Sequence, residues 1–471
     1  MASSSGYHTG VGVRGDREIP MLVLGYMDTA PTAVVDREAS ITWFLATRER
    51  TAELFRLLRP EAYYEQPISL RHPVVFYEGH IPAFSVNTLI KCGLGRPGVD
   101  EGLELLFARG IDPEDQRSAD DVAIHAWPTR DAVQEYVEAA DQLILDALAK
   151  APVEQPGHPV LHRGQAVHTL IEHEELHQET LAYMWHRLPL DRKRRPAGGP
   201  LVTEGVVPPA RQIEVPSGRA TLGAALEEVP FGWDKEFPIH VVDVPAFAID
   251  VHNVTNQEYQ AFVDSGGYGD SRWWSDTDWA WRAAGGIEYP PVWVREDGRW
   301  HWRSMFDLIP LPAAWPVYVT QAEASAFARW RGQRLPTEAE FHRAAYGTPE
   351  GAERSYPWGE DAPDPSRHGN FGFRYWEPVP VGSFPDGVSA WGLHDLVGNG
   401  WEWSSTVFDG FPGFSPMPSY PEYSADFFDG LHYVIKGGSP VTAPGLLRRS
   451  FRNWFRPHYP YVYACFRCVQ G

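Results

Sequence analysis

An uninterrupted helical pattern over residues 161–190 constrains this chain more than any other feature, because it carries two histidines four residues apart. Its apolar residues recur at helical spacing: Leu170, Leu181, Met184 and Leu188. No Gly or Pro interrupts the run between Gly164 and Pro189, so the pattern predicts one long amphipathic helix. His173 and His177 then lie one turn apart on one face, where they can bind a single cation at a fixed separation.

The pattern is also consistent with ordinary surface or core histidines. The same stretch carries His162, His168 and His186, and a short HxxxH motif specifies a metal site only loosely. Two ligands do not complete a metal site, so a choice between a metal site and ordinary histidines depends on whether the rest of the chain supplies further ligands.

Composition and charge narrow the class of protein. A chain of 471 residues is longer than one core usually supports, which predicts two domains. The net charge of −21 argues against nucleic acid and anionic membrane surfaces as partners. Three cysteines make no disulfide framework, and the apolar run at 21–27 is too short for a secretory or membrane segment. We therefore expect a cytoplasmic protein.

The first part of the chain predicts a four-helix bundle. Residues 1–35 are rich in Gly, Ser and Pro and are interpreted as an N-terminal arm. Long amphipathic patterns then follow at 36–58, 74–91, 130–149 and 161–188, giving a helical domain over 36–190. Metal sites in bundles are built from facing helices, so His80 on the second helix is a candidate third ligand.

The character of the chain changes after residues 191–212, which are rich in Pro, Gly and charge and are interpreted as a linker. Residues 213–471 contain short strand-like runs, many turn residues and most of the 19 tryptophans. Helical patterns occur near Thr320–Arg331 and Thr337–Tyr346. The pattern predicts an irregular α+β domain, and the whole chain is classed as α + (α+β).

Several motifs of this second half occur in the order of a known family: Val254–Tyr259, Gln333–Phe341, Tyr356–Gly359, Leu393–Trp403, Lys436–Ser439, Phe451–Trp454 and Cys465–Arg467. Together they resemble the formylglycine-generating-enzyme or sulfatase-modifying-factor domain, a C-type-lectin-like fold. An HxxxHxE helix in a DinB-like four-helix bundle in front of such a domain resembles the nonheme iron sulfoxide synthases. Those enzymes join a thiol to the imidazole of a histidine derivative in ergothioneine and ovothiol biosynthesis, and the chain is most similar to the hercynine-dependent type.

The resemblance implies an iron site and its ligands. The segment Arg71–His80 looks like the one that supplies the family's first histidine, which makes His80, His173 and His177 the expected Fe(II) ligands. Three neutral nitrogens leave up to three positions open, as a thiolate and the co-substrate O₂ require. Glu179, six residues after His173, lies off the ligand face, and we assign it to supporting the ligands or to packing.

The resemblance also implies substrate residues. Within 413–430, Tyr420 corresponds to the family's catalytic tyrosine, a proton donor, and Tyr423 to its neighbour beside the imidazole pocket. Asn453 and Trp454 match a pair that holds the histidine derivative, and Trp454, Tyr420 and Tyr423 could form an aromatic wall for a trimethylammonium group. The alternative for both tyrosines is packing within the lectin-like fold.

Departures from the family pattern leave the substrates open. Phe455 and Tyr459 stand where relatives that use γ-glutamylcysteine carry an acid and an Arg, which favours free cysteine, with Arg452 or Arg456 as its carboxylate partner. Leu176 replaces a Gln that some relatives direct at the imidazole, and the segments around His80 and at 107–112 resemble the ovothiol type, so unmethylated histidine stays an alternative to hercynine.

The leading hypothesis is iron(II)- and O₂-dependent formation of a hercynylcysteine sulfoxide. The alternatives are an ovothiol-type 5-histidylcysteine sulfoxide synthase, a selenoneine-type synthase and a lectin-fold binding protein without catalysis. Formylglycine generation is disfavoured because its cysteine pair has no counterpart: Cys465 and Cys468 are predicted to lie on opposite faces of one last β-strand.

Overall fold

The computed structural model describes residues 35–108, 127–196, 198 and 200–470. The predicted N-terminal arm, apart from Val35, lies outside the described residues. None of the helices in the described ranges is both long enough and apolar enough to span a bilayer.

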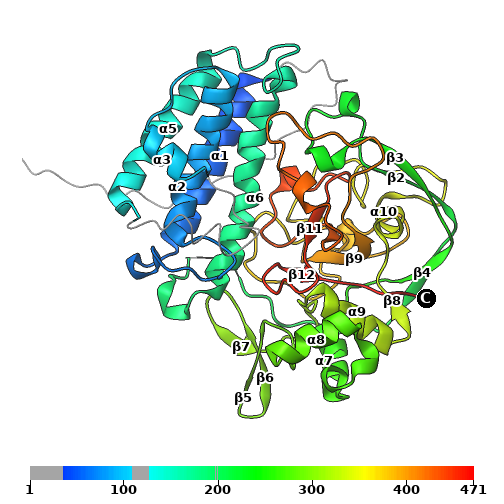
Figure 1. Ribbon diagram of the computed structural model, residues 1–471. Coiled ribbons are helices and arrows are strands. Elements are labelled where there is room, and N and C mark those ends of the chain that lie inside the picture. The colour runs from blue at the N-terminus through cyan, green and yellow to red at the C-terminus, as the bar shows by residue number, and fades with distance from the viewer. Residues whose placement is uncertain (1–34, 109–126, 197, 199, 471) are drawn as a thin grey trace, which may run out of the picture.

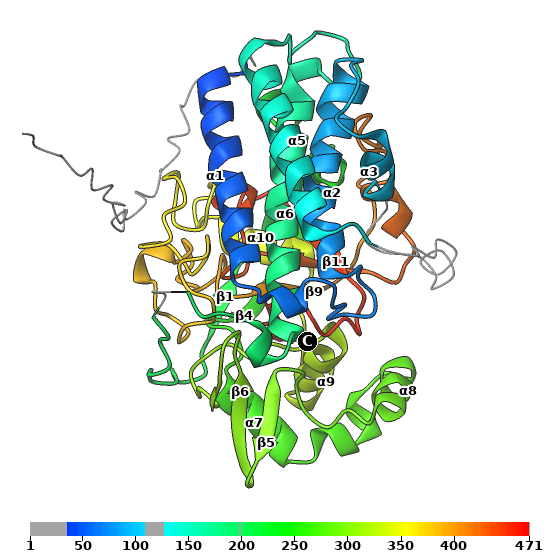
Figure 2. The ribbon, with the colours of Figure 1, turned by 90° about the vertical axis from the view of Figure 1, so that its left-hand side faces the viewer.

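The first half of the chain forms the predicted four-helix bundle, whose long helices stand side by side in both views (Figures 1 and 2). They are α1 (Arg37–Arg56), α2 (Val74–Ser85), α5 (Arg130–Lys150) and α6 (Gln165–Arg187). Side chains cap two of their N-termini, since Asp36 accepts a hydrogen bond from the Ala39 N–H and Thr129 from the Ala132 N–H. A short helix, α3 (Glu101–Leu106), lies beside α2 and was not predicted.

The second predicted helix is not uniform. Pro82 lies inside α2 and cannot donate a backbone hydrogen bond. After Ser85 the chain continues as a wider π-helix, Val86–Gly93, so the expected single helix over 74–91 is in fact two helical forms in series.

The histidine-bearing helix starts later than predicted. Arg163 and Gly164 have φ angles of 56° and 66°, in the left-handed region, so the chain makes a 3₁₀ turn over His162–Gly164 and α6 begins at Gln165. From Ala166 to His186 every residue except His168 and Leu176 is buried. A helix covered on all sides in this way lies at the centre of the molecule. α6 is the bundle helix that lies between the other bundle helices and the α+β domain (Figure 1).

The second half is the predicted α+β domain. Its helices are α7 (Asn256–Asp264), α8 (Asp276–Gly285), α9 (Gln321–Trp330) and α10 (Glu338–Tyr346), and the last two confirm the helices expected at 320–331 and 337–346. Thr255, Thr320 and Thr337 each form a capping box with the Glu three residues later, which fixes where α7, α9 and α10 begin.

The strands form small sheets. One has the order β1 (Gln212–Val215), β4 (Phe247–Asp250), β13 (Val469–Gln470) and β8 (Gln333–Arg334). A second has the order β11 (Asn453–Phe455), β10 (Tyr433–Lys436), β9 (Trp401–Val407) and β12 (Ala464–Cys465), with β12 parallel to β9. Two more are β2 (Gly218–Leu222) with β3 (His240–Val244), and β5 (Trp293–Glu296), β6 (Arg299–Arg303) and β7 (Leu308–Pro310).

The prediction that Cys465 and Cys468 share one strand is wrong. Cys465 belongs to β12 and pairs with Glu402, whereas Cys468 lies just before β13 in the other sheet. Arg467, between the two cysteines, connects the two sheets. It is fully buried, and its guanidinium pairs with Glu402 of β9 at 2.6 and 2.7 Å and donates a hydrogen bond to the Asp250 carbonyl oxygen of β4. Both cysteines are buried free thiols.

The two halves share one apolar core. The cluster that contains Leu170 and Trp185 of α6 also contains Trp401 and Phe451 of the second half. Burial of such large side chains is the main favourable term in folding, so the bundle and the α+β domain stabilise each other across α6.

Candidate metal centre and substrate pocket

Three histidines from two helices converge at the inner face of α6. His80 of α2 places its Nε2 3.1 Å from Nε2 of His177, and that atom lies 3.1 Å from Nε2 of His173. All three nitrogens lie within 4.8 Å of one another, and all three residues are buried. The structure therefore brings together the three residues predicted as metal ligands.

The protonation of these histidines suits a metal. The Nδ1 of His80 lies 2.7 Å from the Phe107 carbonyl oxygen, so Nδ1–H donates there and the Nε2 lone pair faces the other histidines. Burial lowers the pKa of His80 to about 4, and it lowers the pKa values of His173 and His177 well below their usual range, with neighbouring histidines adding to the effect. Neutral imidazoles are the form that coordinates a cation.

The spacing of the nitrogens is the test of fit. Uncharged imidazole lone pairs that face each other at 3.1 Å repel unless a proton or cation lies between them. Bonds of about 2.1 Å to one metal at right angles would put two nitrogens roughly 3.0 Å apart. The triad thus fits a divalent transition metal bound by nitrogen.

Aromatic rings enclose the triad. Phe76 stacks on His80 with ring centroids 4.9 Å apart, and Phe84 stacks on His173 at 3.5 Å. Tyr420 meets the His173 ring edge-on at 6.5 Å and lies 5.4 Å from Phe84. The loop that carries Tyr420 therefore reaches from the α+β domain to the histidine triad.

The other faces of α6 carry buried carboxylates that fix this loop-rich domain to the bundle. Glu172, directly before His173, pairs with Arg448 at 2.8 and 2.9 Å, and Arg448 also pairs with Glu236 at 2.7 and 2.8 Å. Glu172 additionally accepts a hydrogen bond of 2.8 Å from the Trp233 indole. Residues 233–236 and 448 are thereby held at a fixed position relative to His173.

The hydrogen bonds of Glu179 connect α6 to the α+β domain. Its carboxylate accepts hydrogen bonds from the Trp401 indole at 2.6 Å, the Ser439 hydroxyl at 2.7 Å and the Thr442 hydroxyl at 2.9 Å. These partners all belong to the α+β domain, and none is a histidine. Of the two assignments made from sequence, packing between domains matches these contacts and support of the histidines does not.

The rings of Tyr423 and Trp454 lie close together, and both contact the same lysine of the chain. Their rings lie 5.5 Å apart, nearly perpendicular, and Phe451 completes the enclosure. The ammonium of Lys235 lies 5.0, 4.0 and 4.6 Å from the ring centroids of Tyr423, Phe451 and Trp454. The aromatic wall was expected to include Tyr420 and to face a ligand; instead Phe451 takes that place and Lys235 is the cation.

Comparison with known proteins gives the family. Residues 44–181 match the DinB superfamily, and residues 201–471 match the sulfatase-modifying factor enzyme 1-like domain. The hercynine oxygenase of Mycolicibacterium smegmatis is 35% identical over 439 residues, which is 90% of this chain and 96% of that protein. The chain belongs to the hercynine oxygenase family. The resemblance described from sequence is thereby confirmed.

Two further proteins resemble the chain at lower sequence identity. Ergothioneine biosynthesis protein 1 of Neurospora crassa is 27% identical over 512 residues, covering 91% of this chain and 56% of that protein. The solved structure of PvdO from Pseudomonas aeruginosa is 23% identical over 55% of this chain and 93% of its own, with a TM-score of 0.37.

Three residues predicted to bind substrate in this hercynine oxygenase family member have other contacts. Arg452 is buried, with its guanidinium 2.9 Å from Glu338 and over the Phe411 ring, so it is not available as the carboxylate partner that we expected. Asn453 accepts a hydrogen bond from the Trp454 N–H next to it. Arg456 has a side chain 59% exposed and lies 3.8 Å from Asp429.

The sequence interpretation missed Lys235, Glu172 and Arg448. The tripeptide Asp234–Glu236 resembles an ordinary charged turn, and the structure alone shows it buried. Glu172 follows the predicted helix pattern, but its partner lies 276 residues further on, a distance over which a single sequence gives no signal.

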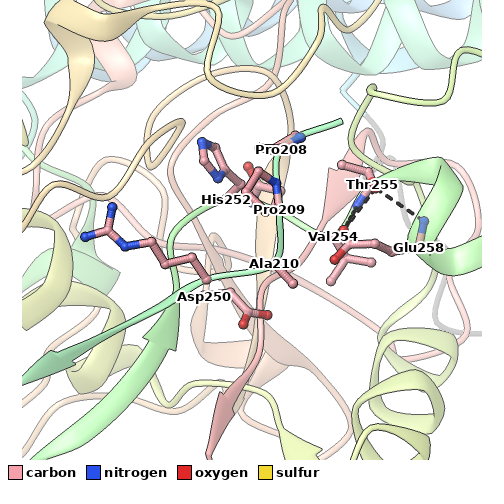
Figure 3. Close-up of a pocket in the computed structure, with 10 residues that line it drawn as sticks. Pro208, Pro209, Ala210, Asp250, His252, Val254, Thr255 and Glu258 are labelled. Atoms are coloured by element: carbon pink, nitrogen blue, oxygen red, sulfur yellow. Dashed lines mark hydrogen bonds between the residues drawn. The ribbon is translucent and has the colours of Figure 1, made fainter. Parts of the chain in front are cut away.

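A hollow of the α+β domain lies between Pro208–Arg211 and Asp250–Glu258 (Figure 3). Asn253 lines it, and both polar atoms of this buried amide lack a hydrogen-bond partner among the described residues. Thr255 at its rim belongs to the capping box of α7 with Glu258. None of the three histidines of the triad contributes to this hollow.

Proposed function

We propose that this protein is an iron(II)- and O₂-dependent enzyme that joins the sulfur of a small thiol to an imidazole carbon of hercynine and oxidises that sulfur to a sulfoxide. One C–H and one S–H bond break, one C–S and one S–O bond form, and O₂ accepts four electrons, giving the sulfoxide oxygen and one water. The observation that carries the proposal is the buried convergence of three histidine nitrogens beside a tyrosine, in a hercynine oxygenase family member.

His80, His173 and His177 would hold the iron through Nε2. When bound, iron(II) with three nitrogen ligands supplies open positions for sulfur and dioxygen and accepts and donates single electrons. The surrounding rings, Phe76 and Phe84, exclude water from the triad and fix the imidazole planes by stacking.

We assign Tyr420 as the proton donor. Its ring is 6.5 Å from His173, whereas Tyr423 is one ring further out and its hydroxyl accepts a 2.9 Å hydrogen bond from Lys235. A phenol at the edge of the triad can deliver a proton to an oxygen that develops charge during the reaction. Tyr423, stacked on Trp233 at 4.1 Å, would instead position the acceptor.

We propose cysteine as the thiol, with Arg456 as its carboxylate partner, since Arg452 is occupied by Glu338. The acceptor would lie beside Tyr420 and the Tyr423–Trp454 pair, near Asn453. We also propose that the enzyme works in the cytoplasm, which agrees with three cysteines that are all free thiols.

The test is mass spectrometry of the protein loaded with Fe(II) under air, given hercynine and histidine as competing acceptors and cysteine and γ-glutamylcysteine as competing thiols. The expected product is hercynylcysteine sulfoxide with one oxygen from ¹⁸O₂, absent without iron or oxygen. If histidylcysteine sulfoxide forms instead, the enzyme is a 5-histidylcysteine sulfoxide synthase of the ovothiol type. Absence of any coupled product from protein that binds iron would overturn the proposal.

A further inference from the structure

The aromatic cage beside the metal centre contains an ammonium group of the protein itself. Lys235 lies in the turn Asp234–Glu236 and is 1% exposed. Its Nζ lies 4.0 Å from the Phe451 ring centroid, 4.6 Å from that of Trp454 and 5.0 Å from that of Tyr423. Three ring faces around one cation are the arrangement by which proteins recognise quaternary ammonium groups.

This ammonium has few other partners. Its Nζ donates one hydrogen bond, of 2.9 Å, to the Tyr423 hydroxyl, and no carboxylate of the described residues lies within ion-pair distance of it. Burial lowers the pKa of Lys235 well below its usual range, opposed by the charges of Glu236 and Asp234. A buried cation without an ion pair is costly; the ring faces, the Tyr423 hydroxyl and the charges of Asp234 and Glu236 act in the opposite direction and favour the charged form.

The residues on both sides of Lys235 are held by hydrogen bonds and an ion pair, so the position of its backbone is fixed relative to the cage. Glu236 pairs with Arg448 and accepts a 2.6 Å hydrogen bond from Ser450. On the other side, Asp234 accepts a 2.6 Å hydrogen bond from Ser424, one residue after Tyr423. Both anchors connect to loops that form the cage.

We propose that Lys235 is a specificity-determining residue, whose ammonium occupies the cage of Tyr423, Phe451 and Trp454 in competition with the quaternary ammonium group of the acceptor substrate. The inference rests on the proposed function for the identity of that acceptor. A trimethylammonium group enters the cage only when Lys235 withdraws, so the lysine weakens binding of methylated acceptors relative to unmethylated ones. Selectivity between hercynine and histidine is then set by residue 235 rather than by the cage alone.

The first experiment needs neither iron nor turnover. Tetramethylammonium chloride is titrated into metal-free protein by calorimetry, with sodium chloride as the salt control. Lys235→Ala should bind tetramethylammonium about tenfold or more tightly than the wild type, because the cage is vacated. Lys235→Arg, which keeps a cation and its volume, should bind as weakly as the wild type.

Two results would overturn the proposal. One is equal affinity in the wild type and a folded Lys235→Ala, checked by near-ultraviolet circular dichroism. The other is a gain that persists in the double variant Lys235→Ala/Trp454→Ala, since binding would then lie outside the cage. Lys235→Ser replaces the alanine variant if the latter does not fold.

The second experiment measures acceptor selectivity. Lys235→Ala should raise the ratio of kcat/KM for hercynine to that for histidine by about tenfold, through KM, with kcat little changed. An equal change for both acceptors would assign Lys235 a structural role and overturn the proposal. If no variant forms a coupled product, the proposed function fails while the tetramethylammonium titration still decides the role of Lys235.

Discussion

The two ends of the site are built in different ways. The metal end consists of three histidines on two helices, held by the bundle and covered by Phe76 and Phe84. The proposed substrate end consists of side chains from separate loops and short elements: Lys235, Tyr420, Tyr423 and Trp454. Regular helices give the ligands fixed separations, whereas loops place the groups that distinguish one substrate from another.

Removing a ligand should break the metal end completely. In His177→Ala the triad loses the nitrogen that lies 3.1 Å from each of the others, so iron affinity should fall by more than about a hundredfold, since even outer-shell changes cost 10–100-fold. Iron content after dialysis measures this. His186→Ala, a buried histidine of the same helix bonded to Tyr463, is the control and should retain iron. Equal iron in both variants would exclude the triad as the metal site.

Removing Arg448 should break the junction between the two ends. Arg448→Met leaves the carboxylates of Glu172 and Glu236 buried without their cation, which should lower the stability by about 3 kcal/mol. The urea midpoint measures the loss. Arg449→Met, which removes one longer contact of 3.4 Å to Glu353, should change the midpoint little. Similar midpoints for the two variants would show that the Glu172–Arg448–Glu236 network contributes no more to stability than a surface ion pair does.

Tyr420→Phe should separate metal binding from coupling. Losing a positioned proton donor should slow sulfoxide formation by about a hundredfold, with iron content unchanged and oxidised thiol as the main product. Product analysis by mass spectrometry measures the ratio. Tyr64→Phe, which removes an exposed hydroxyl bonded to the Pro128 carbonyl, is the control. Undiminished coupling in Tyr420→Phe would remove this residue from the chemistry.

The smallest effect is expected at the rim of the substrate end. Arg456→Ala should change stability by less than about 0.5 kcal/mol, because its side chain is 59% exposed and its ion pair is long. The KM for cysteine should rise by up to about fivefold if this guanidinium holds the thiol's carboxylate. An unchanged KM for cysteine would exclude Arg456 as the residue that binds the carboxylate of the thiol.

Helical periodicity predicted the helix that carries two histidines of the triad. The apolar spacing of 161–188 placed His173 and His177 on one face, and the count of long helices indicated a bundle. The later start of α6 could not be predicted, because it depends on left-handed backbone at Arg163 and Gly164. His80 followed from the bundle and the resemblance together.

The substrate end was predicted only in part. The resemblance identified Tyr423 and Trp454, which do meet, but Lys235 comes from a turn nearly 190 residues earlier in the chain. Arg452 has the residue type expected for binding a carboxylate, yet Glu338 already pairs with it in the interior. Such choices among partners are made by tertiary packing, which spacing along one chain does not encode.

The burial of α6 has a consequence for rearranging these enzymes. Glu172 and Glu179 face the α+β domain, while Glu174 accepts a 2.6 Å hydrogen bond from Thr51 of α1. A chimera cut in the stretch 191–211 would therefore join a helix to a foreign domain that lacks donors for two interior carboxylates. Modular exchange within this family should succeed only when α6 and the segments that carry Arg448, Trp401 and Thr442 are inherited from the same parent.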